Sequence, residues 1–455
     1  MYIIKMATSR FIEIRPDNVP GGQGGRISFK NGFPILSYTI SAQNGLLDPR
    51  SVRIVGDFSA YKDNLVEPTP VRPGDNLTMN NRLGMYNLFD SITVRSVRSN
   101  MICDEIRHLS KFLNTYMGLT SSLQDQMGHL SETCLIMPNA DTFRKSVIES
   151  PVHTGGDPDL KVSQTNSFSL HLPCGFLMSG NMIDLRQDAF GGVQILLDLA
   201  PDSNVFYSTI GDSTGLTDAH YELSNLKLCC EVQDIPDSMS PSPQGVYNFN
   251  TITSLYTSVN STNAQIQYSL ALKNVLSAFM TFMPVANNNT LTSDGSTTTY
   301  MSGTGDATTN LAPFRRIQFL KGGSKFPAEF DFVNSIVADS NTTLPDPEIV
   351  KGFIDAVLPD LALDKTSISP VNANRDYNMI TNAAESSYTN LAEGGALTGL
   401  GVSYGIGGGG EDFSTEQFGV SIESELTLDN PQGVYIFIKA RSQLVWSPNG
   451  VQLLQ

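Results

Sequence analysis

Two runs of apolar residues, one late in each half of the chain, dominate its pattern of hydrophobic and polar positions. Residues 190–208 and 432–450 both open near Gly-Val, continue through Ile, Leu or Phe, and break at a proline near serine and asparagine. A short apolar run that follows glycine and ends in turn residues is typical of a buried strand. The pair predicts a strand-rich domain built twice, although the two runs share few positions and need not be equivalent strands.

Most of the first half alternates apolar and polar residues between turn signals, which predicts strands. The alternating runs are residues 26–40, 52–56, 88–97, 168–176 and 226–232. One stretch instead repeats apolar residues at steps of three and four up to Gly118 and predicts an amphipathic helix over residues 99–118. The apolar stripe of that helix consists of Ile102, Ile106, Leu109, Leu113 and Tyr116.

The second half repeats this organisation. Its strand-like runs are residues 265–270, 275–285, 314–332, 418–428 and 434–454. Asp346 is a good N-cap, Pro347 suits the first helical position and Pro359 stops the pattern, so a helix is predicted over residues 346–358. Two tracts rich in Asn, Thr, Ser and Gly, residues 287–310 and 393–412, are expected to be exposed loops.

Prolines and small polar residues over 234–243 make the best linker in the chain. We therefore predict a glycine-rich, flexible N-terminal arm over residues 1–25, a first domain over 26–236, a linker over 237–246 and a second domain over 247–455. Each half has strands first, one helix in its middle and strands last. The fold class expected from this order is all-β.

Composition supports strands and turns over helices. Charged residues make up 16% of the chain, against roughly 25% in an average globular protein, and 38 Gly and 24 Pro punctuate it. The 45 acidic residues exceed the 29 basic ones by 16, so the surface should repel phosphate backbones and anionic lipid. Direct contact with nucleic acid is not expected.

The cysteines indicate a reducing compartment. Their number is odd and no CxxC pair occurs among Cys103, Cys134, Cys174, Cys229 and Cys230. Buried free thiols are the expected state, with neighbours Cys229 and Cys230 on opposite faces of one strand. The first residues lack the pattern of a signal peptide and no apolar run reaches 18 residues, so we expect a soluble chain that is not secreted by the usual route.

Catalytic, cofactor-binding and metal-binding residues are predicted to be absent, and the chain is not expected to be an enzyme. The five histidines stand singly, and His108 is interpreted as a solvated or capping residue. Asp184, Asp188 and Glu222 could in principle pair as in a glycosidase, but an acidic β-protein has such residues by chance.

Three segments resemble the double jelly-roll major capsid proteins of virophages, polinton-like viruses and the large eukaryotic DNA viruses. They are RISFKNGFPILSYTI at residues 26–40, a strand-then-helix segment at 92–117, and FRRIQFLKGGSKFPAEFDF at 314–332. Asp104, Glu105, Ile106 and Tyr116 stand near the places of that family's helix motif, with looser spacing. The resemblance covers most of the chain in order and length.

This resemblance implies two tandem eight-stranded jelly-roll sandwiches with one or more short helices inserted in each. It further implies homotrimers that form pseudo-hexagonal capsomers and tile an icosahedral viral shell, in a virion assembled in the host cytoplasm or nucleus. The expected partners are neighbouring capsomers, penton and minor capsid proteins, with an internal membrane or cement proteins as further possibilities. The arm would order on assembly, and residues 287–310 and 394–412 would form a solvent-facing tower.

The alternative is a carbohydrate-binding or adhesive β-sandwich, such as a viral spike or minor capsid protein. A protein of that kind should carry aromatic platforms in its loops. The chain has only one tryptophan, Trp446, and it ends a predicted strand. The capsid interpretation is therefore preferred.

Overall fold

The computed structural model describes the strands and helices of both halves of the chain. The described residues are 9–120, 129–134, 165–235, 244–291, 314–326, 332–333, 335–336, 343–344, 352, 355–357 and 400–454, with gaps at 20–26, 30–33, 44, 64–65, 67, 72–74, 76, 81–82, 209–215, 405–409, 425–430 and 448. The predicted linker at 237–246, the tract at 287–310, the helix at 346–358 and the second glycine-rich tract lie largely outside these residues. Residues 352 and 355–357 are helical, as the sequence predicts.

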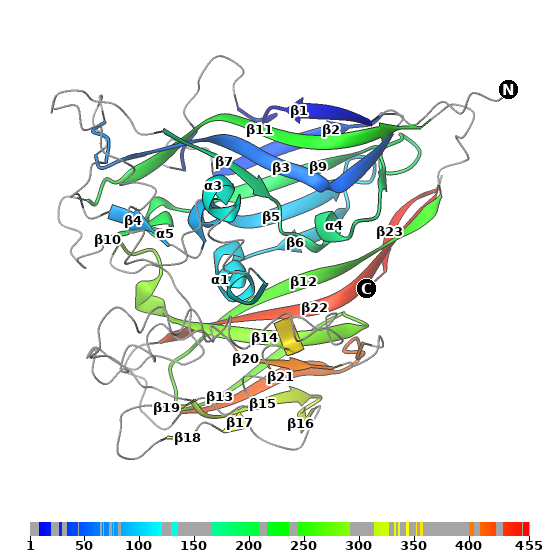
Figure 1. Ribbon diagram of the computed structural model, residues 1–455. Coiled ribbons are helices and arrows are strands. Elements are labelled where there is room, and N and C mark those ends of the chain that lie inside the picture. The colour runs from blue at the N-terminus through cyan, green and yellow to red at the C-terminus, as the bar shows by residue number, and fades with distance from the viewer. Residues whose placement is uncertain are drawn as a thin grey trace.

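The first half forms two antiparallel sheets packed face to face (Figure 1). The outer sheet has the order β1-β11-β3-β7, in which β1 is Ser9–Ile14, β11 is His220–Asp234, β3 is Gly45–Tyr61 and β7 is Thr165–His171. The facing sheet has the order β2-β9-β5-β6, in which β2 is Ile35–Ser41, β9 is Gly192–Leu199, β5 is Phe89–Ser96 and β6 is Ile102–Ile106.

The second half repeats that strand order. One sheet runs β12-β22-β14-β20, with β12 at Gly245–Val259, β22 at Gln432–Ser447, β14 at Val275–Pro284 and β20 at Leu400–Ser403. The other runs β13-β21-β15, with β13 at Asn263–Ser269, β21 at Gln417–Ser424 and β15 at Phe314–Lys321, followed by the short strands β16, Ser324–Lys325, and β17, Phe332–Val333. Numbered along each half, both read 1-8-3-6 and 2-7-4-5, the order of a jelly roll. The predicted all-β double jelly roll is confirmed.

The two apolar runs noticed in the sequence are not equivalent strands. The first is β9, the seventh strand of its barrel, whereas the second is β22, the eighth strand of the other barrel. Both lie in the middle of a sheet, with β9 between β2 and β5, and β22 between β12 and β14. A central position in a packed sheet selects for Ile, Val and Phe in both strands, so their similarity reflects burial.

The remaining elements cap the sheets or join them. The helices are α1, Leu109–Thr120; α3, His129–Cys134; α4, Gly175–Met178; and α5, Asp202–Val205. Short strands are β4, Leu77–Met79; β8, Ile183–Asp184; β10, Phe206–Ser208; β18, Ser335–Ile336; β19, Thr343–Leu344; and β23, Gly450–Leu454. In the part of the chain that the structure describes, 3-10 turns cover Gly84–Leu88 and Val285–Asn287. Among the described residues, no helix is long and apolar enough to cross a membrane.

Two sequence predictions are wrong in part. Ser9–Ile14, placed in the flexible arm, is β1, and it pairs with β11 along all six residues. Ile102–Ile106, placed in the first helix, is strand β6 and pairs with β5, so the helix begins only at Leu109. The change of conformation occurs at His108, whose φ of 54° is a left-handed value that no helix can continue through.

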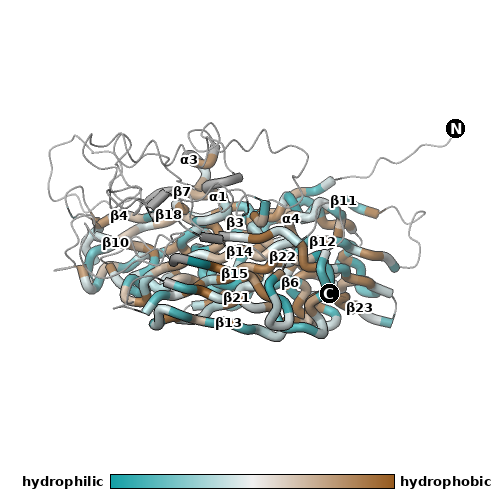
Figure 2. Tube along the Cα trace, turned by 90° about the horizontal axis from the view of Figure 1, so that it is seen from below, coloured by the Kyte–Doolittle hydropathy of each residue, from teal (hydrophilic) through white to brown (hydrophobic). Residues whose placement is uncertain are grey.

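Figure 1 shows the first barrel above the second, with α1 and α4 on the side of the first barrel that faces β12. Figure 2 shows hydrophobic and hydrophilic positions alternating along many of the strand traces. The core of the first barrel continues without a break into residues of the second, among them Tyr247, Phe249, Phe279 and Phe437. A separate apolar cluster fills the second barrel, including Ile266, Phe282, Val420 and Ile438. The two barrels therefore share one core across their junction.

Candidate functional site

The junction between the two barrels contains a buried carboxylate, Asp104. It lies in the edge strand β6 of the first barrel, and only 4% of its surface is exposed. One of its oxygens accepts a hydrogen bond of 2.6 Å from the hydroxyl of Thr251 on β12 of the second barrel. The other accepts bonds of 2.9 Å from the backbone N–H of Phe176 and 3.3 Å from the thiol of Cys174. Asp104 thus ties β6, α4 and β12 together.

The groups that donate hydrogen bonds to Asp104 are neutral hydroxyl, thiol and backbone N–H groups. Burial disfavours its charged form and raises its pKa above the ordinary value, although the hydrogen bonds from Thr251, Phe176, Cys174 and Glu105 oppose this shift. Burial, and after it the nearby carboxylate of Asp104, raises the pKa of the Cys174 thiol well above its ordinary value. Cys174 is therefore a hydrogen-bond donor in this network and not a reactive thiolate.

Helix α4 approaches the second barrel so closely that only glycine fits at its first position. A Cβ atom on Gly175 would lie 1.6 Å from the backbone oxygen of Asn250. Around this contact the Tyr247 hydroxyl donates to the Phe176 carbonyl at 2.6 Å, and the Asn181 amide donates to the Asn248 carbonyl at 3.1 Å. The first turn of α4 is thus fastened to β12 by backbone as well as side-chain groups.

Aromatic rings fill the junction beneath α1. The ring of Phe112 lies 6.1 Å from that of Phe279 on β14 and 5.5 Å from that of Phe437 on β22, measured between centroids. His108 contacts Tyr256 at 5.7 Å and Tyr435 at 5.2 Å. Burying such rings stabilises by about 1.5–3 kcal/mol for each fully buried side chain. The junction is therefore an apolar interface with a polar tie beside it.

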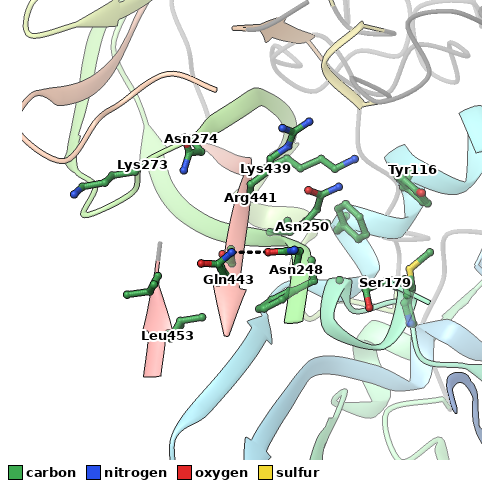
Figure 3. A pocket seen from close by; sticks show the side chains of 18 of the residues that line it. Tyr116, Ser179, Asn248, Asn250, Lys273, Asn274, Lys439, Arg441, Gln443 and Leu453 are labelled. Carbon is green, nitrogen blue, oxygen red and sulfur yellow. Dashed lines mark hydrogen bonds between the residues drawn. The ribbon is translucent and has the colours of Figure 1, made fainter. Parts of the chain in front are cut away.

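A hollow of about 1280 Å³ opens beside this interface. It lies over β12 and β22, with Phe112 and Tyr116 of α1 and Met178 and Ser179 at the end of α4 along its border. Figure 3 shows Lys439 and Arg441 on the strand side of the hollow and Tyr116 and Ser179 across from them. The charged side chains lining it, Lys273, Lys439 and Arg441, are all basic.

Two of the carboxylates singled out in the sequence, Asp184 and Glu222, lie in separate parts of the first barrel. Asp184 pairs with Arg186 at 2.5 Å, and Glu222 lies 3.8 Å from His220. Asp184 stands opposite Leu46 and Glu222 opposite Ser59, 13 residues apart on β3, a separation of roughly 40 Å along an extended strand. The structure therefore does not bring these two carboxylates together.

His108, expected to be solvated or capping, is not solvated but does stand directly before the first residue of α1. Its ring is half-buried among tyrosines, and burial lowers its pKa. Its carbonyl oxygen accepts the first backbone bonds of α1, from Lys111 and Phe112 at 3.0 Å each. Trp446 packs at 5.3 Å against Phe190 of the first barrel and is 9% exposed, so it is no platform for a sugar.

All five cysteines are buried and free, as the sequence predicts. Cys230 belongs to the core of the first barrel, where burial raises the pKa of its thiol to about 12. Within the described part of the chain, no three His, Cys, Asp or Glu side chains gather in a way that could hold a metal ion. The structure reveals a different site, around Asp104 and Thr251. The sequence places Asp104 near the family's helix motif but gives no sign of its contact with Thr251.

No family model and no curated protein matches the chain. Solved structures do match it along its whole length. A chain of the PBCV-1 virus capsid has a TM-score of 0.53 at 12% identity and covers 100% of this chain and 98% of its own. The Faustovirus major capsid protein gives 0.53 at 9% identity, covering 98% and 93%, and a chain of the Sputnik virophage gives 0.54 at 8%, covering 100% and 90%. At such identities the likeness concerns the fold, which is that of two jelly rolls in one chain.

Proposed function

We propose that this chain is the major capsid protein of an icosahedral virus and forms homotrimeric, pseudo-hexagonal capsomers. The observation that carries this proposal is the fusion of two jelly rolls with the same strand order into one body with a continuous core. Three copies of such a body around an axis present six similar barrels to their neighbours. The agreement in fold with the Faustovirus major capsid protein over the full length supports it.

The junction has the mechanical role in this proposal. A capsomer transmits force from one barrel to the next, so the two barrels must keep a fixed mutual orientation. The shared core, the close contact at Gly175 and the tie from Asp104 to Thr251 fix that orientation. The role requires no catalytic group, and its partners are other copies of the chain and neighbouring capsid proteins in the virion.

Oligomeric state tests the proposal. Size-exclusion chromatography with light scattering of the purified chain should give a stable particle of three times 49.4 kDa. Electron microscopy of the same fractions should show hexagonal tiles. A protein that stays monomeric at every concentration up to that of a concentrated stock would contradict the proposal.

A further inference from the structure

Strand β2 forms one edge of its sheet in the first barrel, and its sequence favours pairing with a further strand. Among the described strands it pairs with β9 alone. Its seven residues, ILSYTIS, contain no charge, proline or glycine. Short segments of this kind readily add another strand when their edge is open. Leu36, Tyr38 and Ile40 are fully buried, so the core fixes β2 with its edge facing outward.

The other edges of the first barrel are protected in familiar ways. β1 carries the charged residues Arg10 and Glu13, which are both exposed. Helix α3 lies against β7, and β12 of the second barrel lies against β6. Charges on an edge strand and elements that cover it both prevent association between sheets. β2 has no charged side chain of its own, and its edge is met instead by two residues of the connection from β1.

These two residues, Asp17 and Asn18, form an edge cap on the middle of β2. The Asn18 side chain accepts a hydrogen bond of 3.0 Å from the N–H of Ser37 and donates one of 2.6 Å to the carbonyl of Ile35. The backbone N–H of Asp17 donates to the Ser37 carbonyl at 2.7 Å. The N–H and C=O of one residue in an antiparallel strand point to the same side, so an added strand would need these same groups. The amide of Asn18 thus replaces a peptide group of a neighbouring strand.

The carboxylate of Asp17 places a charge beside the next part of the edge. It accepts a hydrogen bond of 2.6 Å from the hydroxyl of Thr39. Thr39 lies two residues beyond Ser37, so its backbone groups point to the same edge. Two copies that paired through β2 would bring two such carboxylates together, which is unfavourable. The edge cap therefore opposes pairing both by occupying backbone groups and by charge.

We propose that the edge cap prevents β2 from pairing with β2 of a second copy of this chain. The second copy is the partner because it presents the same uncharged strand with the same backbone groups. Two β2 strands related by a two-fold axis run antiparallel, so one sequence is complementary to itself. The inference goes beyond the proposed function and does not rest on it, because it concerns a contact that the folded chain prevents.

The test removes the cap from the full-length chain with Asp17→Ala/Asn18→Ala. The Ser37 N–H loses its acceptor, so its hydrogen exchange should become about tenfold faster or more. Light scattering should detect particles larger than those of the wild type at concentrations where the wild type forms none. Asn18→Asp keeps an acceptor and adds a charge, so it should stay as dispersed as the wild type. The control Asn260→Ala removes an exposed amide between β12 and β13 and should behave as the wild type.

A cross-link identifies the partner strand and separates pairing from aggregation of unfolded chains. A photo-reactive benzoylphenylalanine in place of Ile35, which is 45% exposed, is introduced into a mixture of isotopically light and heavy copies of the double variant. It should join light to heavy copies within the peptide of residues 35–41.

A double variant as dispersed as the wild type overturns the inference, and so do cross-links scattered over other segments. An Asn18→Asp variant that associates as readily as the double variant also overturns it. A wild type that stays monomeric contradicts the proposed function alone, because the test of the edge cap compares variants with the wild type.

Discussion

Strands β3 and β14 are the third strands of their barrels, and they differ in how they are buried. Along much of β3 buried residues alternate with half-exposed ones, as expected for a sheet with one face to solvent. Along β14 every residue is buried except the terminal Pro284. Its residues Ala278, Met280 and Phe282 belong to the core of the second barrel, whereas Phe279 and Met283 belong to the core shared with the first.

The difference shows that the two barrels are unequal partners. The outer sheet of the first barrel is a surface, but the corresponding sheet of the second is an interior layer between two cores. The second barrel therefore depends on the first to cover its sheet, and the junction should control the stability of the whole molecule. The following changes test that asymmetry, beginning with the largest expected effect.

Gly175→Ala should disrupt the junction most. The added methyl carbon would lie 1.6 Å from the Asn250 carbonyl oxygen, and neither backbone can move without separating α4 from β12. We expect a loss of more than about 4 kcal/mol in the free energy of unfolding, a size reserved for defects in packing or buried polar groups. Calorimetry should show the single transition of the wild type lowered or split in two.

The control for that variant is Gly323→Ala. Gly323 lies in the turn between β15 and β16, its φ is 85°, and an added Cβ would meet nothing within 4 Å. Only the left-handed conformation opposes the substitution, at a cost of about 1–2 kcal/mol. Equal losses in the two variants would mean that the contact at α4 does not hold the barrels together.

Phe437→Ala should have the next largest effect. The ring projects from β22 toward Phe112 of the first barrel and is fully buried, so truncation should cost about 3 kcal/mol in a urea denaturation experiment. The matched change on the equivalent strand of the first barrel is Lys227→Ala on β11, where the side chain is 39% exposed and pairs with Glu13. That surface change should cost less than about 1 kcal/mol.

Thr251→Val should cost about 2 kcal/mol, because it removes a hydrogen bond to a buried carboxylate while keeping the shape of the side chain. Thr253→Val, two residues further along β12 at a half-buried position, is the control and should be nearly neutral. Chemical denaturation of both variants measures the difference. A loss for Thr253→Val as large as that for Thr251→Val would show that the strand, and not the bond to Asp104, is responsible.

The sequence predicted those strands and turns whose conformation depends on neighbouring residues in the chain. Glycine is a turn residue that can be read directly from the sequence. Gly322 and Gly323 both adopt a positive φ in the turn after β15, and Gly450 opens β23 of the hairpin with β22. The apolar run of residues 275–285 also predicted burial of β14. Such runs and turns identify strands whatever the rest of the chain does.

What the sequence could not predict depends on contacts between distant segments. Ile102 and Ile106 continue the helical spacing of α1 but belong to β6, because pairing with β5 outweighs the local pattern. The residues of β1 form a strand because they pair with β11, which lies more than 200 positions later in the sequence. Asp104 stands near a family motif in the sequence, but nothing there indicates that its side chain is buried. Asp104 becomes the polar tie of the junction because Thr251 of β12 and Phe176 of α4 donate hydrogen bonds to it.

Asp104→Asn tests the smallest effect, which depends on pH. Burial raises the pKa of Asp104 above its unfolded value of 3.8, so the folded chain takes up this proton more readily than the unfolded chain. The resulting stabilisation is complete below the unfolded pKa and is lost as the pH rises through the folded pKa. His108 acts in the opposite sense, because burial lowers its pKa and acid favours the unfolded chain.

Comparing wild type with Asp104→Asn at each pH cancels the contribution of His108, which both proteins retain. The free energy of unfolding, measured with urea, should rise for the wild type relative to the variant as the pH falls from about 7 to about 4. The expected gain is on the order of 1 kcal/mol, since one pKa unit corresponds to about 1.4 kcal/mol. A difference that stays constant over this range would mean that the junction holds Asp104 with an ordinary pKa. The tie between the barrels would then be an ionised carboxylate whose four hydrogen bonds outweigh its burial.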